Sequence, residues 1–350
     1  MSPRHERRPL SRYLTVILFG LFLALAGCSG GEDGAAGPAG PAGPAGPAGP
    51  AGPAGEAASA DNLTCTECHD SSTLIISKQA QMEEESVHGT GEAFIRGEIG
   101  RCAGCHGSEG AEARIEAGLP PHDESVEGVE NVSPYSCRTC HDIHQTYTRA
   151  DFSLTGDASP VEMEYTAGTY DGGLGNLCSN CHQIRNPQPE VTAGEIETGT
   201  TRFGTHHGAE AQMLLGEGAL GLTGNASIHY QAVDNTCVGC HMGEGRNHTF
   251  EPDLANCQAC HADLDTFDRN GVQTETAELL AEIRPLLVSA GILDNDRDPE
   301  GNRSFDAVFP EEIANAMWNY MFVIEDQSMG VHNPAYTKAM LEYALDVLQQ

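Results

Sequence analysis

The stretch CVGCHMGEGRNHTFEPDLANCQACHADLD, residues 237–265, holds two copies of the pattern Cys-x-x-Cys-His only twenty residues apart. One further histidine, His248, lies between the two copies. Four cysteines and three histidines in so short a span indicate a repeated binding motif rather than ordinary packing residues. The other copies of this motif in the chain indicate what it binds.

The chain has 350 residues and thirteen cysteines, and twelve of the cysteines belong to copies of this pattern. The six copies are CTECH at 65–69, CAGCH at 102–106, CRTCH at 137–141, CSNCH at 178–182, CVGCH at 237–241 and CQACH at 257–261. Their paired cysteines are Cys65 and Cys68, Cys102 and Cys105, Cys137 and Cys140, Cys178 and Cys181, Cys237 and Cys240, and Cys257 and Cys260. The remaining cysteine is Cys28.

The spacing of the pattern has a chemical reason. Two cysteines three positions apart reach the two vinyl groups on one edge of a haem and form thioethers, and the next histidine then lies under the iron. Zinc sites use Cys-x-x-Cys pairs without requiring a histidine after each pair, and a disulfide framework has no use for it. We therefore predict six covalent c-type haems. Their proximal iron ligands are His69, His106, His141, His182, His241 and His261.

The far side of each iron needs a second ligand if the haem is to be a saturated electron carrier, whereas an empty position would make a reaction centre. Eight other histidines follow Cys28, and six are needed. We predict that the distal ligands are His88, His144, His207, His229, His248 and His332. His122 and His206 are the two spare histidines. Which iron each distal histidine binds stays open, and the alternative for any one of them is a surface histidine.

The first 28 residues resemble the export signal of a bacterial lipoprotein. Four arginines precede the apolar segment YLTVILFGLFLALAG, which is short for a bilayer span. The segment runs into LAGC, and the resemblance makes Cys28 the lipidated first residue of the mature protein. Several acyl chains on one cysteine give stable anchoring. We expect an exported protein anchored to the bacterial outer membrane, on its periplasmic or cell-surface face; the alternatives are a plain secretory signal and a short membrane anchor.

Residues 31–57 carry glycine at every third position, with six consecutive Gly-Pro-Ala triplets. This is the collagen pattern, in which only glycine fits the axis of three wound chains. The pattern favours an extended polyproline II spacer over residues 29–60. The alternative is a short triple helix that would make the protein a homotrimer.

Composition and charge limit the function classes. The hydrophobic fraction is 39% and the aromatic fraction only 6%, which is little for a core built from side chains alone. Haem rings would supply the missing apolar volume. The formal net charge of −33 excludes binding to nucleic-acid phosphates and suits a soluble acidic surface.

Residues 61–271 show little apolar periodicity, so we predict a haem domain of loops and short helices there. Residues 272–350 form a helical C-terminal segment that packs on it. One helix carries Leu279, Leu280, Ile283 and Leu287 on one face, and Pro285 should end or kink it. A second helix follows Pro310 and carries the single tryptophan, Trp318. A third has Asn333 as N-cap and Pro334 in its first position. The predicted fold class is mainly α with extensive irregular loops, organised around six covalent haems.

Four segments resemble the multihaem c-type cytochromes of anaerobic metal- and mineral-respiring bacteria, which include lipoproteins of the cell envelope. The segments are HHGAEAQMLLGEG, CVGCHM, HTFEPDLANCQACHADLDTFDRNGVQTE and WNYMFVIEDQSMGVHNPAYTKAML. The resemblance implies haems with two histidine ligands that pass electrons between envelope donors and redox partner proteins or metal and mineral acceptors. Some relatives polymerise into filaments, so a filament subunit is one alternative.

A second alternative is a reductase of a small nitrogen or sulfur oxyanion at one open haem. The C-terminal end resembles the wider group that contains pentahaem nitrite reductases. In that group the catalytic haem commonly has a lysine in place of the proximal histidine. This chain has only two lysines, Lys78 and Lys338, and neither lies in a haem motif. We therefore predict an electron carrier rather than an enzyme.

Overall fold

The structure, a computed structural model, describes residues 73–123, 125–206, 208–296 and 302–350. The chain divides into two compact units, Met1–Glu56 and Ala57–Gln350, and all the described residues belong to the second. Cys28, the glycine repeat, the motif at 65–69 and His207 lie outside the described residues, so the expectations for them stay predictions.

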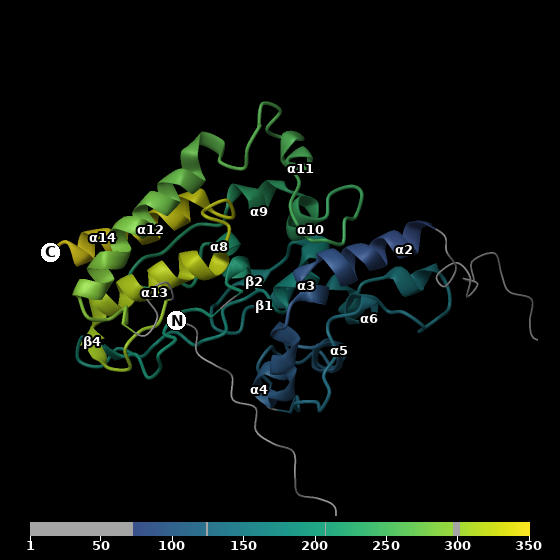
Figure 1. Ribbon diagram of the computed structural model, residues 1–350, viewed down its shortest axis with the longest axis horizontal. Helices are drawn as coiled ribbons and strands as arrows, with labels where there is room; N and C mark the ends of the chain where they lie inside the picture. Colours follow the sequence, from purple (N-terminus) through teal and green to yellow (C-terminus); the bar gives the residue numbers. More distant parts are fainter. Residues whose placement is uncertain (1–72, 124, 207, 297–301) are drawn as a thin grey trace, which may run out of the picture. The chain divides into compact units, whose positions relative to one another are not determined.

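Short helices joined by irregular segments make up residues 73–271, as the weak periodicity predicted (Figure 1). The α-helices are α2 (Thr73–Ala80), α3 (Val87–Thr90), α4 (Gly100–Ala103), α5 (Ser108–Glu116), α6 (Cys137–Cys140), α7 (Asn176–Ser179), α8 (Glu210–Leu215), α9 (Ile228–Ala232), α10 (Thr236–His241) and α11 (Leu254–Gln258). A π-helical turn, η1 (Gln81–Glu85), and five short 3-10 helices lie between them; the latter are η2 (Ala93–Glu98), η3 (Arg149–Phe152), η4 (Thr155–Ala158), η5 (Gly173–Gly175) and η6 (Arg269–Gly271).

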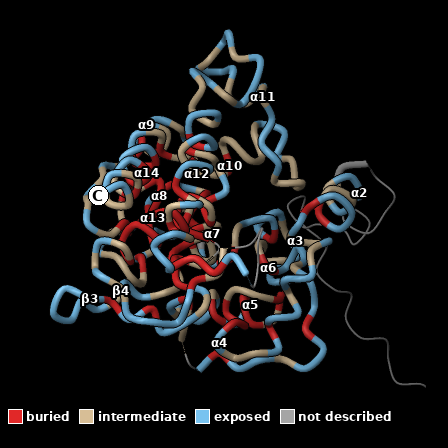
Figure 2. The backbone as a smooth tube through the Cα atoms, turned by 60° about the vertical axis from the view of Figure 1, so that its left-hand side comes forward, coloured by how far each residue is buried: buried red, intermediate tan, exposed pale blue. Residues whose placement is uncertain are grey.

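Three longer helices follow: α12 (Val272–Ser289), α13 (Glu311–Asp326) and α14 (Pro334–Leu348). They lie side by side in both views, and α14 contacts α12 and α13 (Figures 1 and 2). The predicted face of α12 is confirmed, because Ile283 and Leu287 are buried and Leu279 and Leu280 pack against the same core. The predicted cap of α14 is also confirmed, since the Asn333 side chain accepts a hydrogen bond from the Tyr336 N–H.

We expected Pro285 to end or kink the first of these helices; the helix does not end there, because α12 continues through Pro285 to Ser289. Proline removes one N–H and leaves the carbonyl four residues earlier, that of Ala281, without its helical partner. Both Ala281 and Pro285 are exposed, so water can bind that carbonyl. The buried face one turn on, at Leu287, keeps the helix in place.

The apolar core joins these helices to part of the preceding region. Trp318 and Phe322 of α13 are buried together with Ile184, Ile196 and Met213. Strand β3 (Glu195–Glu197) pairs antiparallel with β4 (Val308–Pro310), with Ile196 opposite Phe309. Since β4 leads directly into α13, the pairing fixes the start of that helix against residues 195–197.

Residues 73–181 contain few large buried apolar side chains. Figure 2 shows buried segments gathered around α8, α13 and α14, whereas α2 and α11 are largely exposed or intermediate. A second, small cluster holds Met163, Tyr170, Ala211 and Leu214, next to the hairpin of β1 (Val161–Glu162) and β2 (Thr169–Tyr170). Among the described residues, no helix combines the length and apolar character needed to cross a membrane.

Candidate haem sites

Each described Cys-x-x-Cys-His motif forms one helical turn. The histidine N–H donates to the carbonyl of the first cysteine at 2.9 Å in the motifs that begin at Cys102, Cys137, Cys178 and Cys257. The fifth motif lies wholly inside α10. Residues three and four apart in a helical turn share one face, so both thiols and the imidazole point the same way. The ten described cysteines form no disulfide and are available for thioethers.

Four histidine pairs face each other at nearly the same separation, and each joins a motif histidine to a predicted distal ligand. The ring centres are 6.1 Å apart for His88 and His182, and 6.3 Å apart for His141 and His248, His229 and His261, and His241 and His332. An imidazole nitrogen binds a first-row metal at about 2 Å, so two rings on opposite sides of one iron have centres roughly 6 Å apart. The four spacings fit one iron each.

The hydroxyl residue two positions before some of these histidines is a helix cap. Ser86 and Ser227 are buried, and their side chains accept hydrogen bonds from the N–H groups of His88 and His229. The cap starts α3 and α9 and holds each histidine in the first turn. Val87 and Ile228, the residues between, are 74% and 67% exposed. Such apolar side chains beside an iron ligand are suited to contact a haem face.

The second ring nitrogen of several predicted ligands is held by a backbone carbonyl. The Nδ1 atoms of His141, His229, His241 and His248 lie 2.7–2.9 Å from the carbonyls of Phe152, Val331, Phe250 and Arg246, respectively. A carbonyl only accepts, so each Nδ1 carries the hydrogen and Nε2 keeps a lone pair for a metal. This is the tautomer that an iron site requires, and the residues therefore fit the group.

Two other ligands have carboxylates beside Nδ1 instead. Asp326 Oδ1 lies 2.7 Å from Nδ1 of His332, and Glu210 Oε2 lies 3.2 Å from Nδ1 of His182. Glu210 raises the pKa of His182 to about 9. Burial lowers the pKa of His332, but Asp326 more than offsets this and raises it to about 9.

His88 has the opposite electrostatic setting. Burial, together with the neighbouring His182 and His241, lowers the pKa of His88 to about 4. Its imidazole is therefore neutral at pH 7, with a lone pair free for a metal. Phe250 packs edge-on against the His88 ring at 4.9 Å, so the loop after α10 also contributes to this site.

Three motifs meet at their cysteines. The Cys105 and Cys181 thiols interact electrostatically, and so do those of Cys178 and Cys237, so each pair of thiols lies close together. The motifs at 102–106 and 237–241 thus lie on two sides of the motif at 178–182. Groups attached to these sulfurs would have neighbouring edges.

Arg114 joins two of these motifs. Its guanidinium is fully buried and donates to the carbonyls of Gly104, Leu119 and Asn180 at 2.7, 3.3 and 3.0 Å. Gly104 and Asn180 are the residues just before the second cysteine of their motifs. A Cβ on Gly104 would lie 2.9 Å from Arg114 Cδ, so glycine is needed there. The bonds hold the two motifs in a fixed relation.

The two spare histidines have other partners. His122 Nδ1 lies 2.6 Å from Glu164 Oε2, and burial lowers the pKa of His122. His206 Nε2 lies 2.8 Å from an Arg185 nitrogen, and the other terminal nitrogen of Arg185 lies 3.6 Å from Cys102 Sγ. The loop with His206 is therefore close to the motif at 102–106.

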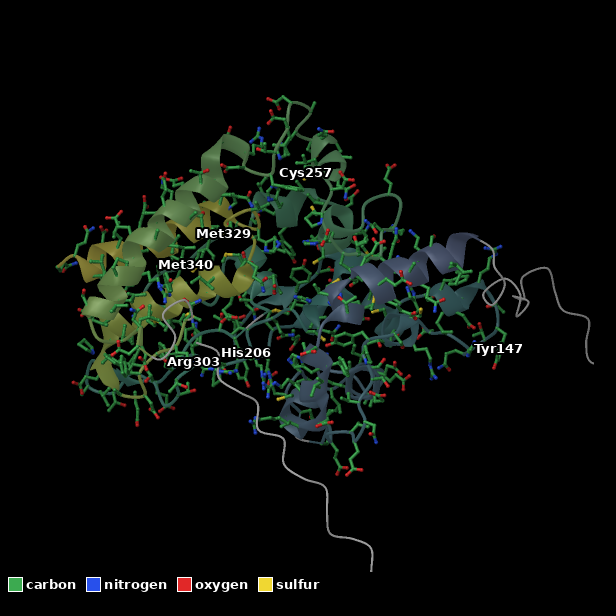
Figure 3. The ribbon with its side chains drawn as sticks, in the orientation of Figure 1. Tyr147, His206, Cys257, Arg303, Met329 and Met340 are labelled. Atoms are coloured by element: carbon green, nitrogen blue, oxygen red, sulfur yellow. The ribbon has the colours of Figure 1, made fainter. Side chains whose placement is uncertain are left out.

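His144 lies in a different part of the molecule. Its ring stacks on Tyr147 at 5.6 Å. Figure 3 shows Tyr147 at an outer loop, far from His206, and Cys257 far from both. The loops that carry His144 and His206 therefore lie in different parts of the molecule.

Sequence reasoning did not find Glu210, Asp326, Arg114 or Phe250. Asp326 and Arg114 left a weak signal, because each is a charged residue in a helix that the structure buries. Glu210 and Phe250 left none, since their roles come from contacts with residues distant in the chain.

Comparison with known proteins finds a family match over part of the chain. Residues 57–153, which include the motifs at 65–69, 102–106 and 137–141, match the cytochrome c3 family, and the match indicates covalently bound c-type haem. No curated protein matches the chain significantly.

Two solved structures of multihaem cytochromes share a low overall similarity with this chain. The outer cell wall cytochrome OcwA is 20% identical with a TM-score of 0.48, over 78% of this chain and 50% of that one. The undecahaem cytochrome from the S-layer of Carboxydothermus ferrireducens is 19% identical with a TM-score of 0.43, over 79% of this chain and 40% of that one. The chain thus spans about half the length of OcwA and 40% of the length of the other cytochrome.

Proposed function

We propose that this chain is a six-haem c-type cytochrome that carries electrons at the cell envelope, with two histidines on every iron. The observation that carries the proposal is the set of four ring pairs at 6.1–6.3 Å. His88 pairs with His182, His248 with His141, His332 with His241, and His229 with His261. Chance contacts between histidines would not repeat one spacing four times with one motif histidine in each pair.

The other two irons take the two distal candidates that remain. Arg185 connects His206 with Cys102, which supports His207 as the distal ligand of the iron at 102–106. His144 is then left for the iron at 65–69. The proposal keeps His122 and His206 as the spare histidines; Nε2 of His206, the nitrogen that an iron would need, already accepts a hydrogen bond from Arg185.

Saturated ligation favours electron transfer over bond chemistry. A haem iron, when bound, supplies one-electron chemistry, and two histidine ligands leave no position for a substrate. The Cys105 thiol lies close to Cys181, and the Cys178 thiol lies close to Cys237, so groups attached to them would have neighbouring edges, as short-range electron transfer needs. The chain's own residues thus provide spacing, ligation and a fixed relation between motifs.

The cell-envelope location is supported by the N-terminal sequence. The proposal includes lipidation of Cys28, an outer-membrane anchor, and a Gly-Pro-Ala spacer between the anchor and the haem domain. Donors and acceptors are then redox partner proteins, or metals and minerals outside the cell. Replacing Cys28 with alanine is expected to release the protein from the membrane fraction and to remove the lipid mass from its N-terminus.

The test is the spin state of the ferric protein by electron paramagnetic resonance and optical spectroscopy. We expect all the iron to be low-spin and not to bind nitrite or carbon monoxide. His332→Ala should convert one iron in six to a high-spin, ligand-binding form, whereas His122→Ala should convert none. High-spin iron in the unaltered protein would overturn the proposal in favour of a reductase with one open haem.

A further inference from the structure

The ligand histidines differ in what their second ring nitrogen contacts. Four of them face backbone carbonyls, whereas His182 and His332 face carboxylates. A carboxylate is a stronger acceptor than a carbonyl, and hydrogen bonds to an ionised acceptor are roughly twice as strong as neutral ones. The two irons at 178–182 and 237–241 therefore have a different electrostatic setting from those at 137–141 and 257–261.

Asp326 is held in place for this contact. Its side chain is 0% exposed and lies at the end of α13. Oδ1 faces His332, while Oδ2 accepts a hydrogen bond from the Ser328 hydroxyl. Ser328 Oγ also accepts from the His332 backbone N–H at 3.2 Å. Ser328 thus closes the turn between the aspartate and the histidine and fixes the orientation of the Asp326 carboxylate.

Glu210 approaches the neighbouring site from α8. Its Oε2 atom is buried, and no described group other than the His182 ring nitrogen 3.2 Å away lies close to it as a polar partner. Glu210 also interacts electrostatically with His332, so it lies near two predicted iron ligands, His182 and His332. Oε2 has no hydrogen-bond partner among the described groups, so the His182 ring, 3.2 Å away at Nδ1, is the group that this carboxylate is placed to polarise.

We propose that Glu210 and Asp326 are positioning residues that lower the reduction potentials of the irons bound by His182 and His332. This inference rests on the proposed function, since it requires iron at both histidines. A carboxylate draws the Nδ1 hydrogen toward itself and makes the imidazole a stronger electron donor, which stabilises the ferric state. Reduction adds one electron from an external donor and moves no proton, because Nδ1 keeps its hydrogen in both states.

The test compares the isosteric variants Asp326→Asn and Glu210→Gln in the full haem-loaded chain. An amide keeps the shape and an acceptor oxygen but removes the charge. Asp326→Asn should raise one of the six midpoint potentials in a spectroelectrochemical titration, and Glu210→Gln should raise that of the His182 site most and that of the His332 site less. The expected change is roughly tenfold in the reduction equilibrium constant of one haem, or about 59 mV for one electron. The low-spin resonance of that haem should also shift.

The matched control is Glu217→Gln. Glu217 lies in the same segment as Glu210, but its carboxylate accepts from the Gly168 backbone N–H at 3.0 Å. The control should leave all six potentials unchanged. Low-spin spectra with unchanged potentials in both Asp326→Asn and Glu210→Gln would overturn the inference while leaving the two-histidine proposal intact. Equal shifts at every haem, or in the control, would also overturn it, because they would report net charge alone.

If Asp326→Asn does not fold, Glu210→Gln still decides the question, because its side chain is 20% exposed and disturbs packing less. High-spin iron in the unaltered protein is the separate outcome that removes the proposed function itself.

Discussion

The helical region at 272–350 and the cysteine-rich region at 73–271 differ in what fills their interiors. Helix α13 buries Trp318, Phe322 and their neighbours against α12 and α14. Residues 184–219 of the cysteine-rich region contribute to this same core, whereas residues 73–183 have scattered buried groups such as Ser86 and Arg114, and exposed apolar residues such as Val87. One region is stabilised by its own side chains, whereas the other has surfaces shaped to contact attached groups.

The contrast explains how a chain with a hydrophobic fraction of 39% can fold. Each histidine pair joins segments distant in the sequence, such as His88 of α3 and His182 after α7. An iron between them would act as a cross-link that helices of four residues cannot replace. The helical region needs no such link.

Producing the chain without haem attachment should have the largest effect and should lower amide protection in one region but not in the other. We expect the cysteine-rich segments before Ile184 to lose nearly all amide protection, because their few buried apolar groups cannot offset chain entropy. Helices α12–α14 and the segments that pack on them should keep protected amides. Hydrogen exchange followed by mass spectrometry measures both regions in one sample. Equal protection throughout would show that the cysteine-rich region folds by itself.

The sequence predicted the helical region well because its signal is local. The spacing of Ile283 and Leu287, and the cap at Asn333, depend only on nearby residues. The continuation of α12 through Pro285 was missed, since tertiary burial of Leu287 overrides the local cost of proline.

For the cysteine-rich region the sequence predicts candidate residues but not their pairing. The motif predicts the proximal ligands, and the serine two residues before His88 and His229 caps the short helix that carries each histidine. Neither tells which iron His248 or His332 faces, because that depends on how distant segments meet. The same limit applies to Glu210, whose partner His182 comes from another segment.

The next largest expected effect is that of a core substitution in the helical region, which should lower stability without altering the haem sites. Trp318→Ala removes a buried ring that packs on Phe203 and donates to the Gly218 carbonyl at 3.0 Å. The expected loss of unfolding free energy is about 3–5 kcal/mol, measured by denaturant titration. Haem spectra of the folded protein should stay unchanged. Trp318→Phe keeps most of the packing and should cost clearly less; an equal cost would assign the effect to the lost hydrogen bond.

In the cysteine-rich region the matching test is Arg114→Met. The methionine fills much of the space but leaves the carbonyls of Gly104 and Asn180 without their donor. We expect a loss of about 2–3 kcal/mol, because hydrogen bonds from a charged group are strong and buried carbonyls need partners. Arg138→Met, at an exposed arginine in the motif at 137–141, is the control and should change stability little. A comparable loss in the control would contradict a specific role for the buried cation.

The smallest expected effect lies at the junction of the regions, at Asn333. Its Oδ1 caps α14, and its Nδ2 donates to the carbonyls of Met213 and Asn225 at 3.0 and 2.9 Å. Asn333→Ala removes both functions and should cost about 1–2 kcal/mol. Asn333→Asp keeps the cap and removes the two donors, so it isolates the bonds that hold α14 to α8 and the segment before α9.

His332 directly precedes Asn333 and faces His241 in the cysteine-rich region. If the two Nδ2 bonds position this histidine, Asn333→Asp should broaden the low-spin resonance of one haem even where thermal stability changes little. If it alters stability alone, the cap and the iron site are independent, and Asp326 with Ser328 suffices to hold His332. The two outcomes decide whether the helical region merely supports the cysteine-rich region or also fixes one of its iron sites.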